Sequence, residues 1–207
     1  MINYTNIISY PRSGQALIER IFNFYATKHN IFYKYCEFYR CCKTIPCIHG
    51  ANFQKNHDLS LELKLRQDTR YIVLYRSDKI EQLSSFLRWN FKKKLKHNID
   101  KRRADQFLLD ANIYYEGFIN KWVANSTREN IKVFDYLDIC KNPYILLNAM
   151  SYAFDGYECG GYRTALKEFL KKEKIHRIIK LDEFNNYTLD YVSDTPQGKP
   201  RGFCSVT

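Results

Sequence analysis

The chain has 207 residues, of which 45% are hydrophobic and 16% aromatic, and its formal net charge is +11. This length and apolar content can bury a substantial core, which excludes a disordered tail. No stretch approaches 18 apolar residues, and the first residues read as a strand, so we expect neither a membrane anchor nor a signal peptide. The composition predicts one cytoplasmic domain over residues 1–207, with a flexible tail from about residue 185.

The first predicted element is an apolar strand over residues 5–9 that runs into the turn Tyr10-Pro11-Arg12-Ser13-Gly14. An amphipathic helix over residues 14–27 follows, and its apolar stripe consists of Leu17, Ile18, Ile21, Phe22 and Tyr25. The amino end of a helix offers free N–H groups and a positive dipole, and the turn adds a guanidinium and a hydroxyl. The turn is therefore predicted to hold a phosphate. It is not a nucleoside-triphosphate P-loop, which requires a second glycine and a Lys-Ser/Thr pair.

The turn resembles the Y-P-[KR]-S-G motif of sulfotransferases, where this loop holds the 5′ end of 3′-phosphoadenosine 5′-phosphosulfate (PAPS). The resemblance implies that the cofactor contacts Arg12, Ser13, Gly14, Gln15 and Ala16. The family usually has Thr-Thr-Trp after the glycine, so this chain loses an adenine-stacking ring there, although the Gln15 amide could donate a hydrogen bond. An ordinary strand-turn-helix connection is the alternative interpretation.

Two further strands are predicted over residues 31–35 and 51–55, and Lys55 and His57 come at the end of the second. Both side chains project to the same side of an extended segment, because side chains alternate with period two. The segment Phe53–Asp58 resembles the family's K-T-H segment, with Asn56 where Thr is commoner. The resemblance implies that His57 takes the acceptor proton as general base, while Lys55 and Arg12 stabilise the departing phosphate. A structural histidine is the alternative.

A buried strand is predicted over residues 70–75, followed by a helix over residues 79–95. Arg76 lies at the strand exit, and Ser84 comes about two helical turns later, so that both side chains could reach one anion. This spacing resembles the 3′-phosphate site of sulfotransferases. The alternative is a capping arginine and a solvated serine.

Later segments complete an alternation of strands and helices. A strand is predicted over residues 131–135, with Phe134 in place of a family Tyr near adenine, although a core role for this ring is equally consistent with the pattern. The other predicted helices cover residues 105–123, 143–154 and 162–173. This order predicts an α/β fold in one domain, with a parallel β-sheet flanked by helices. The resemblance implies a P-loop NTPase-like sulfotransferase fold.

The family's carboxyl-terminal R-K-G-x-x-G segment, which also reaches the 3′-phosphate, is the poorest match. The segment Gln197–Phe203 has glycines and cations, and Lys199 or Arg201 is the favoured anion contact there. The segment Gly156–Gly161 has glycines but no cations. A flexible loop or tail is the alternative for both.

Four of the seven cysteines, at positions 36, 41, 42 and 47, fall in one short segment. No C-x₂-C pair is present, and adjacent cysteines cannot easily both ligate one tetrahedral ion, so we expect no metal site. A disulfide or an ordinary loop is favoured over zinc, and the absence of a secretion signal favours reduced thiols.

Residues 88–103 contain eight cations and one acid, together with Trp89 and Phe91. Such a stretch can attract a polyanion, although a solvated helix end is the simpler interpretation. We therefore expect a PAPS-dependent sulfotransferase that needs no metal and acts on a small-molecule or glycan acceptor, including an acidic one, rather than on nucleic acid. The alternative is a non-catalytic basic module of the same fold that binds polyanions or nucleic acid. A nucleotide-dependent kinase is disfavoured because the P-loop signature is missing.

Overall fold

The computed structural model describes residues 4–91, 101–155, 161–172, 176–182 and 186–192. Its centre is a five-stranded sheet in which every strand pair is parallel, so the predicted α/β class and parallel sheet are confirmed. The strands are β1 (Thr5–Ser9), β2 (Tyr35–Glu37), β3 (Phe53–Asn56), β4 (Arg70–Tyr75) and β5 (Ile131–Asp135). Their order is β2-β3-β1-β4-β5, which places β1 between β3 and β4.

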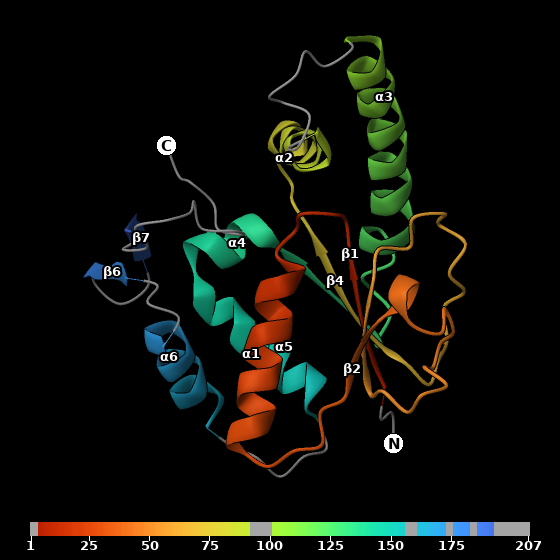
Figure 1. Cartoon of the computed structure of the whole chain (residues 1–207). Helices are drawn as coiled ribbons and strands as arrows, with labels where there is room; N and C mark the ends of the chain where they lie inside the picture. The colour runs from red at the N-terminus through yellow and green to blue at the C-terminus, as the bar shows by residue number, and fades with distance from the viewer. Residues whose placement is uncertain (1–3, 92–100, 156–160, 173–175, 183–185, 193–207) are drawn as a thin grey trace.

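Helices cover both faces of this sheet (Figure 1). The α-helices are α1 (Gln15–Lys28), α2 (Lys79–Phe91), α3 (Lys101–Phe118), α4 (Tyr136–Lys141), α5 (Leu146–Ala153) and α6 (Tyr162–Lys172). Shorter turns are η1 (Phe38–Arg40), the π-helical η2 (Ile119–Val123) and η3 (Pro143–Ile145). An antiparallel pair, β6 (His176–Asp182) and β7 (Asn186–Val192), lies apart from the sheet. Within the described ranges, no helix combines the length and apolarity needed to cross a membrane.

The alternation of side chains along each strand divides the core into two layers. Ile7 of β1 packs with α1, α4, α5 and α6, whereas the next residue, Ile8, packs with α3 and η2. All five residues of β1 are buried, as a central parallel strand covered on both faces requires. The loop that follows β1 is thereby held by a rigid strand.

The bounds of β2 differ from the prediction of a strand over residues 31–35. The side chain of Asn52 accepts a hydrogen bond from the Lys34 amide at 2.8 Å and donates one to the Phe32 carbonyl at 2.8 Å. These bonds satisfy backbone groups of residues 32 and 34, just before β2. Strand pairing between β2 and β3 therefore begins only at Tyr35. The predicted bounds of β1, β4 and β5 agree with the structure.

Candidate functional site

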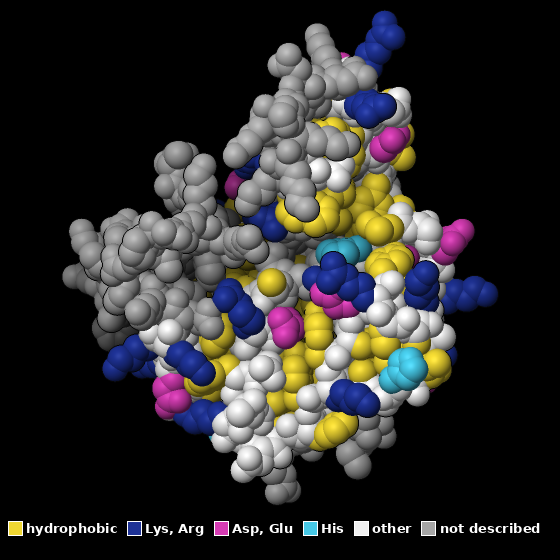
Figure 2. Space-filling view, in the orientation of Figure 1, with side chains coloured by type: hydrophobic (Ala, Val, Ile, Leu, Met, Phe, Trp, Pro, Cys, Tyr) yellow, Lys and Arg dark blue, Asp and Glu magenta, His cyan; other side chains and the backbone are white. Residues whose placement is uncertain are grey.

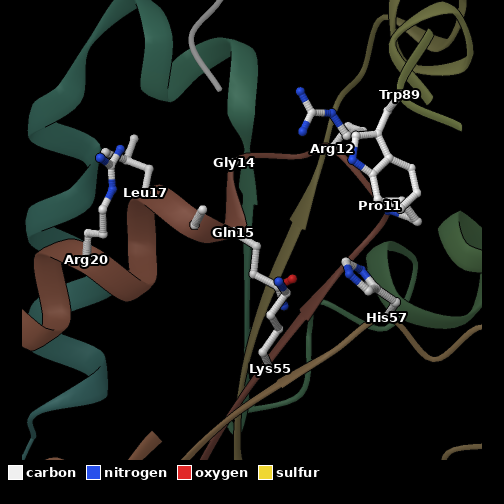
Figure 3. A pocket seen from close by; sticks show the side chains of 10 residues that line it. Pro11, Arg12, Gly14, Gln15, Leu17, Arg20, Lys55, His57 and Trp89 are labelled. Carbon is white, nitrogen blue, oxygen red and sulfur yellow. The ribbon is translucent and has the colours of Figure 1, made fainter. Parts of the chain in front are cut away.

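A cavity of about 280 Å³ opens where β1 and β3 end (Figure 3). It is lined by Pro11, Arg12, Gly14, Gln15, Ala16, Leu17, Arg20, Lys55, His57 and Trp89. The loop after β1 and the segment after β3 were predicted separately from the sequence, and their residues meet in this cavity. Figure 2 shows basic, histidine and hydrophobic side chains next to one another on this face.

The loop between β1 and α1 is held in a fixed shape by a glutamine of α2. Arg12 and Gly14 have left-handed backbone angles, with φ of 73° and 79°. The buried Ser13 hydroxyl donates to Gln82 Oε1 at 3.0 Å, and Gln82 Nε2 donates to the Pro11 carbonyl. The Ser13 hydroxyl is thus committed to the protein, rather than directed toward the cavity as a phosphate donor.

The side-chain amide of Gln15 also donates its hydrogen bonds inside the protein. Its Nε2 atom donates to the Ile7 carbonyl at 2.7 Å and lies 3.4 Å from the Asn56 carbonyl. The first residue of α1 is therefore tied to β1 and β3. The predicted hydrogen bond from this side chain to a phosphate would require these contacts to break. The donors that remain in this segment are the backbone N–H groups at the start of the helix.

Gly14 connects the loop to the Arg76 segment through a single ring. A Cβ atom at Gly14 would lie 2.1 Å from Cδ2 of Tyr136, and the Arg76 guanidinium lies over that same ring, 4.7 Å from its centroid. The Arg76 side chain is buried and its Nη1 atom donates to Glu81 Oε1 at 2.9 Å. The loop and Arg76 thus both pack against one tyrosine ring.

Replacing Gly14 with alanine should therefore destabilise the protein by about 2–4 kcal/mol, because a left-handed φ and a clash with Tyr136 act together. Gly50 is the matched control, since its φ of 72° is similar but a Cβ there would meet nothing within 4 Å. Gly50→Ala should cost only about 1 kcal/mol in urea unfolding. Equal losses for the two variants would contradict the close packing of Gly14 on Tyr136.

The imidazole ring of His57 is held in place by Ser9. Its Nδ1 atom lies 2.8 Å from the Ser9 carbonyl and 3.2 Å from the Ser9 hydroxyl. A carbonyl can only accept, so the proton resides on Nδ1 and the lone pair on Nε2. Burial lowers the pKa of His57 below its ordinary value, with a smaller contribution from Lys55, while the hydrogen bond to Ser9 opposes the shift. The neutral ring is thus a proton acceptor beside the cavity.

The residue after His57 anchors this segment to η2. The buried Asp58 accepts hydrogen bonds from Lys121 Nζ at 2.7 Å and from Trp122 Nε1 at 2.9 Å through the same oxygen. Its other oxygen accepts from the Leu63 amide at 2.9 Å. Tyr114 of α3 donates its hydroxyl to the His57 carbonyl. The backbone that carries the imidazole is therefore fixed from two directions.

The Lys55 ammonium lines the cavity and forms an ion pair with Glu37. Its Nζ atom lies 3.2 Å from Glu37 Oε1, and the two residues are register partners on β3 and β2. Burial raises the pKa of the neighbouring Glu19, against the attraction of Lys55 and Arg20. The cations that line the cavity thus have carboxylate neighbours outside its lining, and an entering anion would compete with Glu37 for Lys55.

The remaining predicted site residues do not line this cavity. Ser84 lies half-buried on α2, and Phe134 is buried in the core beside α1 and α4, which agrees with the structural alternative for that ring. Lys199 and Arg201 lie outside the described residues, as do Lys92, Lys93, Lys94 and Lys96 of the basic stretch. The described part of the chain thus assembles the loop and the His57 segment around one cavity, whereas Arg76 does not line it and lies over the Tyr136 ring.

The sequence did not predict Gln82 or Arg20 as site residues, and it placed Trp89 only in the basic stretch of residues 88–103. Gln82 locks the loop after β1, Arg20 extends the cavity along α1, and Trp89 forms its wall beside Arg12 (Figure 3). Trp89 is 56% exposed and stacks on Phe86 at 6.2 Å. Arg20 could have been found from its place one turn after Leu17 on the same helix, whereas Gln82 and Trp89 depend on tertiary packing.

No protein-family model matches the chain, and no curated protein matches it significantly. The cavity and the strand-end segments around it are therefore the grounds for inferring a function.

Proposed function

We propose that this protein is a PAPS-dependent sulfotransferase with a P-loop-like fold, which moves a sulfuryl group to a hydroxyl or amine of an acceptor. One observation carries the proposal. The three segments that resemble the family follow β3, β1 and β4, which are neighbours in the sheet, and two of them share a cavity. Ligands of open α/β sheets bind at this carboxyl edge, which supports a cofactor site there.

The donor nucleotide would bind with its 5′-phosphate at the start of α1. The backbone N–H groups after Gly14 and the helix dipole favour an anion at that place, and Arg12 and Lys55 line the same cavity. Sulfuryl transfer spreads negative charge onto the leaving phosphate, as phosphoryl transfer does. Cations fixed beside the leaving group stabilise that charge without reorganisation during the reaction.

Arg76, which lies over the Tyr136 ring, would receive the 3′-phosphate. Its guanidinium has five N–H donors, of which one bonds to Glu81, so the fork can bind an anion while its orientation over Tyr136 is kept. Ser84 follows on α2 and would contribute a hydroxyl, as the family pattern implies. The departures at Gln15-Ala16-Leu17 leave adenine without a stacking ring in that segment.

His57 would remove the proton of the acceptor. Its Nδ1–H group is fixed on Ser9, and the lone pair of Nε2 is available at neutral pH because burial lowers the pKa. Trp89 provides an aromatic wall on the same cavity, suited to the apolar face of a sugar or an aromatic ring. In this proposal the base and the departing phosphate lie on either side of the transferred group, as in-line displacement requires.

The direct test is the conversion of PAPS to 3′-phosphoadenosine 5′-phosphate in the presence of a panel of acceptors: phenols, neutral and acidic sugars, a tyrosine peptide and an amine. We expect acceptor-dependent product formation without added metal, lost in Arg12→Ala and retained in Gly50→Ala. Phosphate transfer from ATP with Mg²⁺, or no turnover with any acceptor, would contradict the proposal. A protein that instead retains only salt-dependent polyanion binding would favour the basic-module alternative.

A further inference from the structure

Three cysteine sulfurs gather at the β2 edge of the sheet, outside the cavity, and a fourth, that of Cys42, lies beside one of them. The Sγ atoms of Cys36, Cys41 and Cys47 all lie within 4.8 Å of one another. The sulfurs of Cys41 and Cys42 lie 3.8 Å and 3.5 Å from that of Cys47, and all four residues are free cysteines. Sulfurs around a tetrahedral zinc are about 3.8 Å apart, given Zn–S bonds of about 2.3 Å, whereas a disulfide requires about 2.05 Å.

The backbone turn after η1 lets two adjacent cysteines approach the same sulfur atom, that of Cys47. Cys41 ends η1 with φ of −119° and ψ of −125°, and Lys43 has a left-handed φ of 55°. The chain thus bends sharply on both sides of Cys42. Both sulfurs of the Cys41–Cys42 pair approach Cys47 as a result, which regular helix or strand geometry would prevent.

Hydrogen-bond donors surround two of the sulfurs. Gln54 Nε2 donates to Cys36 Sγ at 3.4 Å, and the Thr44 hydroxyl donates to Cys42 Sγ at 3.0 Å. Outer donors of this kind orient thiolate ligands and stabilise their charge.

We propose that Cys36, Cys41, Cys42 and Cys47 bind one zinc ion. Four protein ligands close the coordination sphere, so the ion would be structural rather than catalytic. Cys36 lies on β2 and the other ligands follow η1, so the metal would fasten this loop to the sheet edge. Cys36 directly precedes Glu37, the partner of Lys55, and the metal would therefore stabilise one wall of the cavity as well. The site does not depend on the proposed transferase activity.

The test begins with the metal content of the full chain, purified under reducing conditions without chelator and measured by inductively coupled plasma mass spectrometry. We expect about one zinc per chain. Reconstitution with Co²⁺ should give thiolate-to-metal charge-transfer absorption of a four-thiolate tetrahedral site. Cys47→Ser should lose the metal, with circular dichroism reporting whether the variant remains folded.

Two matched variants of Cys41 still test the proposal if Cys47→Ser does not fold. Cys41→His preserves a ligand atom and should retain about one equivalent of metal, whereas Cys41→Ser should bind it at least tenfold more weakly. Three results would overturn the proposal: less than about a tenth of an equivalent in the wild type with no cobalt absorption, equal metal content in both Cys41 variants, or an intact mass and peptide map showing a disulfide at Cys47.

Discussion

His57→Ala should reduce sulfuryl transfer by about 10²- to 10⁴-fold while leaving nucleotide affinity within about twofold, because a general base acts on the acceptor proton and not on the cofactor. The imidazole lines the cavity and is oriented by the Ser9 carbonyl, 2.8 Å from Nδ1. The measurement is kcat for PAPS turnover together with the dissociation constant of 3′-phosphoadenosine 5′-phosphate. His49→Ala, at an exposed histidine outside the cavity, is the control and should keep the wild-type rate.

The pH dependence of the rate provides a second readout for the same residue. A protonated imidazole cannot accept the acceptor proton, so kcat should fall as the pH decreases through the pKa of His57. Burial lowers that pKa, and the acid limb should therefore lie below the ordinary histidine value of about 6.5. The residual activity of His57→Ala should lack this limb. An unchanged rate and an unchanged pH profile in the variant would remove His57 from the mechanism.

Asp58→Ala should lower the free energy of unfolding by about 2–4 kcal/mol, because it leaves the Trp122 indole N–H without its acceptor and Lys121 without its counter-ion. The Lys121 side chain is 21% exposed, so water partly solvates its charge after the substitution. The loss of the ion pair should therefore cost less than that of a fully buried pair. Urea unfolding followed by fluorescence measures the loss. The segment that carries His57 should also loosen, so kcat should fall more than stability alone explains when assayed well below the melting temperature.

Asp68→Ala is the matched control for Asp58. Asp68 also pairs with a cation, Arg66, at 2.6 Å, but its side chain is 62% exposed. Exposed pairs contribute about 0–1 kcal/mol, so the control should unfold close to the wild type. Similar losses at the two positions would contradict the assignment of Asp58 as the buried anchor of the His57 segment.

The strands of the sheet core were predictable because each is a short, buried run that ends at a turn. The apolar residues of β1, β4 and β5, bounded by turn residues, predicted these strands at their observed bounds. The helix α4 was not predicted, although Asp135 caps it by accepting from the Leu137 amide at 2.9 Å. Six residues are too few for an apolar stripe to be recognised, and only the capping residue signals the helix.

The candidate site was predictable only where local sequence determines it. The loop after β1 and the pair of Lys55 and His57 follow strands, and parallel strands bring their ends together. The hydrogen bonds that Ser13 and Gln15 make inside the protein could not be predicted from local sequence. Their partners Gln82 and Asn56 lie in distant segments of the chain. The cysteine cluster was visible in the sequence, but zinc was disfavoured there because the spacing matches no common zinc pattern, and the approach of the sulfurs depends on the left-handed turn at Lys43.

The most direct measurement is a calorimetric titration of the protein with 3′-phosphoadenosine 5′-phosphate, AMP and ATP, repeated with Arg76→Ala. If Arg76 binds the 3′-phosphate, this charged contact should contribute about 1.5–3 kcal/mol, so the bisphosphate should bind about 10- to 100-fold more tightly than AMP. Arg76→Ala should abolish that difference while AMP affinity remains. Equal affinity for the three nucleotides, or binding of none, would contradict a PAPS site at the ends of β1, β3 and β4.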